Sequence, residues 1–188
     1  MSRDVSVNGE SYSSSLFFEN DAVMSLQDMI DLELKNQAPP EWTPTKKSCV
    51  VFGLAAALKY IHSLRIIHNN IKTTKILLNK DYEPLLSDFS NAAIVQSPTE
   101  GCLTTYNVGT LAWKSPEMIN ERPYTLPSDV FAFGQIVHSI ISLKLPFPQT
   151  MANKDVEEQL SNWNQDTILE RSKGLEQFED GYLAIYQT

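Results

Sequence analysis

One expected helix constrains the fold of this chain more than any other feature of its sequence. Between Asp129 and Ile141, apolar side chains fall on more than one face of the helix. They are Val130, Phe131, Phe133, Ile136, Val137, Ile140 and Ile141. A helix of this kind is stable only when other elements cover it, and Pro146 and Pro148 stop it. The rest of the chain is therefore expected to pack around one central buried helix.

A second long helix is expected to begin at Thr43. Pro44 follows, and proline fits the first turn of a helix because the N–H that it lacks has no partner there. Gly53 and the alanines at 55–57 allow a neighbouring element to approach closely. Cys49 stands at the start of the apolar stretch and is expected to be a core or near-core thiol. The buried face is predicted from helical spacing and comprises Val51, Leu54, Leu58 and Ile61.

Shorter elements complete an α+β, mainly α, fold. Ser25 and Asp28 form a capping-box pattern that opens a short helix ending before Pro39. Residues 76–78 and 84–86 flank a turn at 79–81 and predict a β-hairpin. Further expected elements are a strand at 66–67, a long loop over 90–115, which shows no periodicity, and two polar helices over 153–164 and 165–185.

The 188 residues are enough for one domain but too few for two ordinary ones. Residues 1–14 are Ser-rich and polar and are expected to form a disordered tail, which leaves residues 15–188 for the domain. The net charge of −8 argues against nucleic-acid and anionic-membrane partners. The longest apolar run, 49–58, is about half the length of a membrane span. With few cysteines and no signal sequence, the chain is expected in an intracellular, cytoplasmic compartment.

Four segments occur in a fixed order and carry a resemblance. They read HNNIKTTK at 68–75, DFS at 88–90, GTLAWKSPE at 109–117 and SDVFAFG at 128–134. Together they resemble the protein kinase signatures H-R-D-L-x-x-x-N, D-F-G and A-P-E. The third segment and Lys72 are similar to the Ser/Thr-specific, tyrosine-kinase-like group. The resemblance runs from about Leu16, at the position of the hinge, and implies a protein kinase-like fold whose C-terminal lobe (C-lobe) is helical with short β-hairpins.

The resemblance places substituted residues at two catalytic positions. Asn70 stands where active kinases carry the aspartate that accepts the substrate proton, and a neutral amide accepts no proton at pH 7. Lys75 stands where an asparagine holds the second Mg²⁺. A cation about 4 Å from a divalent ion, at a dielectric of about 20, is repelled by roughly 8 kcal/mol. The Lys75 ammonium is expected either to contact a nucleotide phosphate directly or to face solvent.

Other matched residues keep the family's residue type. Asp88 corresponds to the Mg²⁺-binding aspartate, and Leu77 to the residue under the adenine ring. Lys72 and Thr110 correspond to the lysine that contacts the transferred phosphate and to the threonine that ties the loop to the base. With Asn70 in place, both are expected to serve structure. The resemblance implies packing or anchoring roles for His68, Phe89 and Asp129. Glu117 corresponds to a glutamate that pairs with an arginine in the family, and this arginine is expected to be missing.

The phosphate-gripping half of a kinase is not found in this sequence. The glycines stand at 9, 53, 101, 109, 134, 174 and 181, and they form no G-x-G pattern. Before Leu16 the sole basic residue is Arg3. We therefore expect a domain that lacks the N-terminal lobe (N-lobe), is truncated at both ends, and binds ATP and Mg weakly or not at all.

Two functions remain open. The first is a pseudokinase that binds a protein partner, such as another kinase or a regulator. The second is a fragment of a Ser/Thr kinase that binds ATP and transfers phosphate once an N-lobe completes it. Exposed apolar side chains at Leu16–Phe18 and Leu77 are expected to make the isolated chain associate.

Overall fold

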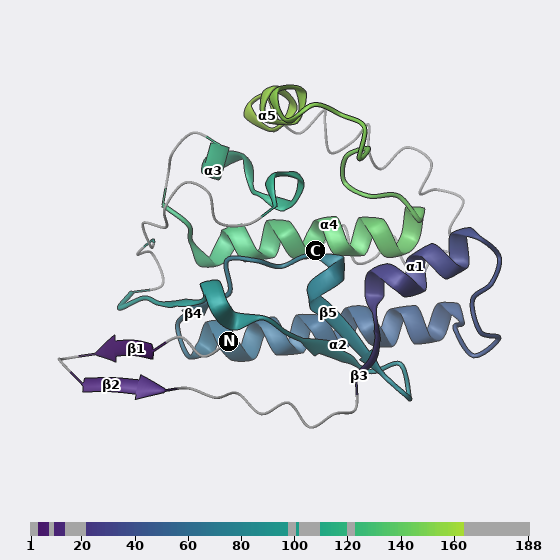
Figure 1. Cartoon of the computed structure of the whole chain (residues 1–188), viewed down its shortest axis with the longest axis horizontal. Coiled ribbons are helices and arrows are strands. Elements are labelled where there is room, and N and C mark those ends of the chain that lie inside the picture. The colour runs from purple at the N-terminus through teal and green to yellow at the C-terminus, as the bar shows by residue number, and fades with distance from the viewer. Residues whose placement is uncertain are drawn as a thin grey trace.

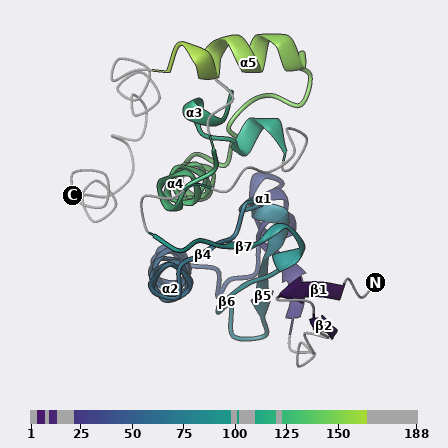
Figure 2. The ribbon, with the colours of Figure 1, turned by 90° about the vertical axis from the view of Figure 1, so that its left-hand side faces the viewer.

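The computed structural model describes residues 4–7, 10–13, 22–97, 101, 110–119 and 123–163. Their helices and small sheets are arranged around helix α4, Leu126–Ser142 (Figures 1 and 2). Helix α2 and the small sheets lie on one side of α4, and helices α3 and α5 lie on the other. The helix-rich α+β architecture expected from the sequence is confirmed.

Helix α4 has the central position that its sequence predicts. Thr125 and Ser128 form a capping box at its start, and Pro127 occupies the first turn. The helix ends at Leu143, which adopts a left-handed conformation with φ 55°. Its buried apolar residues are Ala132, Ile136, Val137, Ile140 and Ile141. These side chains belong to the main core, which α1, α2, β5 and Trp113 complete.

Helix α2, Pro44–Ser63, begins where expected, because the Thr43 side chain accepts a hydrogen bond from the backbone N–H of Lys46. Gly53 allows the predicted close approach: a Cβ added there would lie 2.6 Å from Pro84 Cγ. The expectation of a core thiol is wrong, since Cys49 is exposed. At 100° per residue, Cys49 falls on the side of the helix away from the core face. That face comprises Val50, Val51, Leu54, Leu58 and Ile61.

A three-stranded antiparallel sheet in the order β3-β5-β6 packs beside α1 and α2. Its strands are β3, Ala22–Ser25, β5, Ile76–Asn79, and β6, Pro84–Leu86, so the predicted hairpin is confirmed. The pairing of β3 with β5 shifts register between Ala22 and Met24. Helix α1, Leu26–Leu34, follows β3 directly, and its Ser25–Asp28 capping box forms as predicted.

The expected long loop over 90–115 contains ordered elements. Strand β7, Ala93–Ile94, pairs with β4, Ile66–Ile67, and a 3-10 turn, η3, covers Leu111–Trp113. A strand of two residues shows no periodicity, so sequence pattern did not reveal it. Short helices α3, Pro116–Ile119, and α5, Asn153–Ser161, follow, and α5 confirms the first of the two polar helices. The second, expected over 165–185, lies outside the described residues.

Two short strands occupy part of the segment expected to be a disordered tail. Strands β1, Asp4–Val7, and β2, Glu10–Ser13, pair antiparallel. The sequence between them is Asn8-Gly9, a dipeptide typical of hairpins that an argument from composition overlooks. Within the described part of the chain, no helix combines the length and apolar character that a membrane crossing requires.

Candidate functional site

The loop between β4 and β5 is held by a buried carboxylate on α4. Asp129 is fully buried. Its Oδ2 accepts a hydrogen bond of 2.8 Å from the backbone N–H of His68, and its Oδ1 accepts one of 3.1 Å from that of Asn69. His62 Nε2 lies 3.1 Å from the same carboxylate. The anchoring role expected for Asp129 is borne out, and it fixes residues 68–70 against the core.

His68 and Phe89 pack together, as the resemblance implies. Their ring centroids lie 4.7 Å apart, and His68 Nε2 lies 3.0 Å from the carbonyl oxygen of Ser87. Burial lowers the pKa of His68, since desolvation penalises the charged imidazolium more than the nearby acidic groups favour it. His68 therefore links the loop to the segment that follows β6.

The two substituted positions meet at one carboxylate. Lys75 Nζ lies 2.7 Å from Asp88 Oδ2, and Asn70 Nδ2 donates to the same oxygen at 3.3 Å. Ser90 Oγ donates to Asp88 Oδ1 at 2.6 Å. The hydrogen bond from Lys75 is the main reason that the pKa of Asp88 falls to about 2. Lys75 is thus paired with Asp88 while its side chain stays 31% exposed, and its contact with a nucleotide phosphate stays a prediction.

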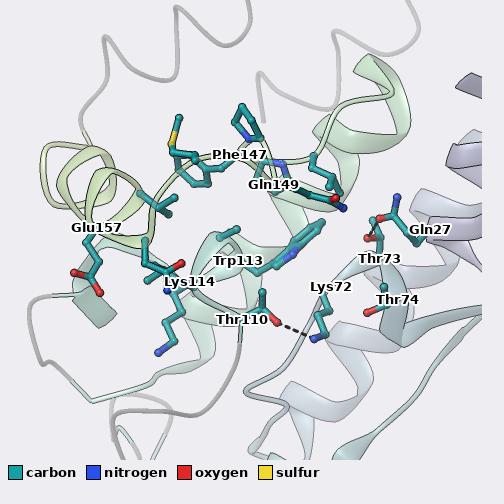
Figure 3. Close-up of a pocket in the computed structure, with 18 residues that line it drawn as sticks. Gln27, Lys72, Thr73, Thr74, Thr110, Trp113, Lys114, Phe147, Gln149 and Glu157 are labelled. Atoms are coloured by element: carbon teal, nitrogen blue, oxygen red, sulfur yellow. Dashed lines mark hydrogen bonds between the residues drawn. The ribbon is translucent and has the colours of Figure 1, made fainter.

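Lys72 and Thr110 form a separate contact. Lys72 Nζ donates a hydrogen bond of 2.7 Å to Thr110 Oγ1, which joins the loop after β4 to the start of η3 (Figure 3). Burial, and then the nearby charge of Lys75, lower the pKa of Lys72. This geometry agrees with a structural role for the pair.

The structure describes some of the remaining expected site residues but not all of them. Leu77 is half-buried on β5, whereas Leu16–Phe18 and Gly109 lie outside the described residues. The apolar surface expected around Leu16–Phe18 therefore stays a prediction. Glu117 has a partner of a kind that was not anticipated, because Ser128 Oγ donates to its Oε1 at 2.9 Å.

A cavity of about 650 Å³ lies beside this constellation (Figure 3). Trp113 stands between two polar ends: Lys114 and Glu157 are at one, and Lys72 and Thr74 are at the other. The cavity is lined by residues from α1, the loop 72–74, η3, the segment 145–151 and α5. The sequence did not identify Trp113 and Phe147 as cavity-lining residues, since no local pattern distinguishes a cavity-lining aromatic residue from a core one.

The fold is that of a protein kinase. The structure matches a chain in the crystal structure of the yeast RNA Pol II CTD kinase CTDK-1 complex with a TM-score of 0.62 and 17% identity. The match covers 83% of this chain and 48% of that one. At this identity, the likeness shows the fold alone.

Sequence comparison shows the family. Residues 6–181 match the model of the protein kinase domain, and the chain belongs to this family. It is 30% identical to the receptor-like kinase SOBIR1 of Arabidopsis thaliana over 155 residues, which are 80% of this chain and 24% of that protein. It is 33% identical to the kinase HT1 of the same plant over 98 residues, or 52% of this chain and 24% of HT1. The chain thus spans about a quarter of the length of these relatives.

Kinases of this family use ATP and Mg²⁺, so the described residues can be tested for their fit to both. Leu77, which corresponds to the residue under the adenine ring, lies half-buried on β5, and its contact with adenine stays a prediction. The Mg²⁺ position does not fit, because the Lys75 ammonium lies 2.7 Å from Asp88 Oδ2 and has no lone pair with which to become a metal ligand.

Proposed function

We propose that this chain is a catalytically inactive, pseudokinase-type binding module built on the C-lobe of the kinase fold. The observation that carries the proposal is Asn70, whose amide donates to Asp88 at 3.3 Å. A carboxamide accepts no proton at pH 7, and general-base assistance contributes about 10²- to 10⁴-fold in rate. The position that needs a base therefore holds a hydrogen-bond donor.

The retained scaffold supports a binding role. Asp129 still holds the backbone of the loop 68–70, and Lys72 still ties this loop to Thr110. These contacts preserve the shape of the site while the proton acceptor is absent from it. A binding module needs the shape of the site but not the proton acceptor, so these contacts are consistent with a binding role.

We further propose that a protein segment binds in the cavity beside Trp113. The cavity combines an aromatic wall, to which Trp113 and Phe147 contribute, with charged groups at its ends, among them Lys114 and Glu157. The lining residues divide about evenly between apolar and polar side chains, which suits a ligand that is partly buried and is also held by hydrogen bonds and charge. An extended peptide fits this description.

Phosphate transfer tests the first part of the proposal. The chain is incubated with labelled ATP, Mg²⁺ and a generic protein substrate, beside Asn70→Ala and the control Asn162→Ala on the exposed end of α5. We expect no transfer above background from any of the three proteins. Transfer by the unaltered chain that disappears only in Asn70→Ala would overturn the pseudokinase assignment.

A degenerate library of extended peptides tests the cavity. We expect the unaltered chain to enrich a sequence motif, and Phe147→Ala or Lys114→Glu to lose that enrichment. The exposed Lys154→Glu on α5 changes the same charge outside the cavity and should keep it. Equal enrichment by all four proteins would place peptide binding elsewhere.

The alternative is a fragment of an active Ser/Thr kinase. It is favoured by the length comparison, since the chain covers 48% of the matched solved kinase chain. Adding the N-lobe of a relative as a separate chain would supply a glycine loop and a lysine, but not a base at Asn70. We therefore expect thermal shifts with ATP and Mg²⁺ to stay small without the N-lobe, and phosphate transfer to stay absent with it. Transfer restored by the added lobe would favour the fragment.

A further inference from the structure

The carboxylate of Asp88 is surrounded by donors from its own chain. Oδ2 receives Lys75 Nζ at 2.7 Å and Asn70 Nδ2 at 3.3 Å, and Oδ1 receives the hydroxyl of Ser90 at 2.6 Å. Lys75 brings a full positive charge to the place where a metal ion would need a negative one. We propose that Lys75 is a resident cation at Asp88, and that it closes this carboxylate to Mg²⁺ and Mn²⁺.

The backbone holds the two partners next to each other. Lys75 is the last residue of the 3-10 turn η1, Thr73–Lys75, directly before β5, and Asp88 follows β6. The ladder between these strands pairs Ile76 with Leu86. Ser87 then donates both its N–H, at 3.0 Å, and its hydroxyl, at 2.8 Å, to the carbonyl oxygen of Lys75. The ion pair is therefore set by strand pairing, unlike a pair formed by two freely moving surface side chains.

Of the three donors, only Lys75 is an unavoidable obstacle to a metal ion. Mg²⁺ requires oxygen ligands in a near-octahedral arrangement. The Asn70 amide can turn to present its oxygen, and the Ser90 hydroxyl can rotate its proton away. An ammonium group carries three donors and no lone pair, so it cannot become a ligand in any orientation. A divalent ion at Asp88 must first displace it.

Lys72 provides a comparison, since it is close enough to Lys75 and Asp88 to feel their charges. It carries the same charge, but its ammonium donates to Thr110 Oγ1 at 2.7 Å. Removing the Lys72 charge therefore changes the local potential and leaves Asp88 engaged. Removing the Lys75 ammonium changes the potential and also takes the charged donor away from Asp88 Oδ2, where only the Asn70 amide then remains.

Mn²⁺ binding to the 188-residue chain, followed by the electron paramagnetic resonance signal of free Mn²⁺, tests the proposal. We expect no binding by the unaltered chain up to millimolar Mn²⁺, and at least tenfold tighter binding by Lys75→Asn. Adding Asp88→Asn to Lys75→Asn should abolish this gain. Lys72→Asn, the matched charge control, should show no binding over the same Mn²⁺ range, like the unaltered chain.

Three results would overturn the proposal. One is Mn²⁺ binding by the unaltered chain that Asp88→Asn removes, a measurement that stays decisive even if Lys75→Asn fails to fold. The second is a folded Lys75→Asn, checked by circular dichroism, that gains no affinity. The third is an equal gain in Lys72→Asn, which would make the effect one of total charge. Since no phosphate transfer is measured, the outcome is independent of the proposed binding function.

Discussion

Replacing Asp129 with asparagine should destabilise the chain while hardly changing the shape of the side chain. The two oxygens of Asp129 accept from the backbone N–H groups of His68 and Asn69, at 2.8 and 3.1 Å, in a fully buried place. The asparagine keeps one acceptor oxygen and turns an NH₂ group toward the other donor. One buried N–H then loses its partner, and the remaining bond loses its charge.

The magnitude follows from these two losses. A buried donor left without a partner costs about 1–3 kcal/mol, and a hydrogen bond to a charged group is worth about 1.5–3 kcal/mol, against about 1 kcal/mol for a neutral one. Together they predict that Asp129→Asn lowers the free energy of unfolding by about 2–4 kcal/mol. A small domain has about 5–15 kcal/mol in all, so the variant should still fold.

Urea denaturation at 25 °C measures this loss, with the slope of the transition compared between variants to confirm that the same surface unfolds. Asp155→Asn is the matched control, because Asp155 is an exposed aspartate in the first turn of α5. It should change the unfolding free energy by less than about 0.5 kcal/mol. A loss below about 1 kcal/mol in Asp129→Asn would refute the reasoning, since it would mean that the loop 68–70 does not depend on this carboxylate.

Three further predictions concern stability. Gly53→Ala should be neutral or destabilising by up to about 2 kcal/mol, because the clash with Pro84 offsets the gain in helix propensity. Gly134→Ala should stabilise by about 0.5–1 kcal/mol, since no described atom lies within 4 Å of its added Cβ. Thermal denaturation of both variants compares the two effects. The pKa of Asp88 is lowered from 3.8 to about 2, so the contribution of this carboxylate to the free energy of unfolding is present above about pH 4 and is lost as the pH falls toward 2. Because the group is partly exposed, we expect a loss of about 1 kcal/mol. Unfolding of the unaltered chain and of Asp88→Asn, measured across this pH range, should show the difference. Ser25→Ala should cost about 1 kcal/mol by breaking the capping box of α1, and a change of under 0.3 kcal/mol in urea denaturation would contradict it.

Elements with local signals were the ones that sequence could predict. The Ser25–Asp28 capping box and the Thr43-Pro44 start signal each act within one turn, and both helices begin where those signals stand. Strand β7 was missed, since two residues carry no period and their pairing with β4 is set by tertiary contacts. Cys49 was misplaced because it was assigned from the apolar run 49–58 alone, whereas the helical spacing of Val51, Leu54, Leu58 and Ile61 puts it on the opposite side of α2.

The site was predictable to the extent that the family resemblance fixes roles. The anchoring by Asp129 and the packing of His68 against Phe89 follow from matched positions, and the structure bears them out. The ion pair between Lys75 and Asp88 does not follow from matching, because a lysine at that position has no counterpart among the family's signatures. Its partner became evident only once the pairing of β5 with β6 was known.

The three-stranded sheet has consequences for how copies of this chain can meet. Its outer strands in the described part of the chain are β3 and β6, and unpaired outer strands commonly recruit strands from other molecules. Here β6 begins with Pro84, which has no N–H to offer, and β3 changes register between Ala22 and Met24. Both strands are short, at three and four residues. This sheet is therefore a poor template for growth by strand addition.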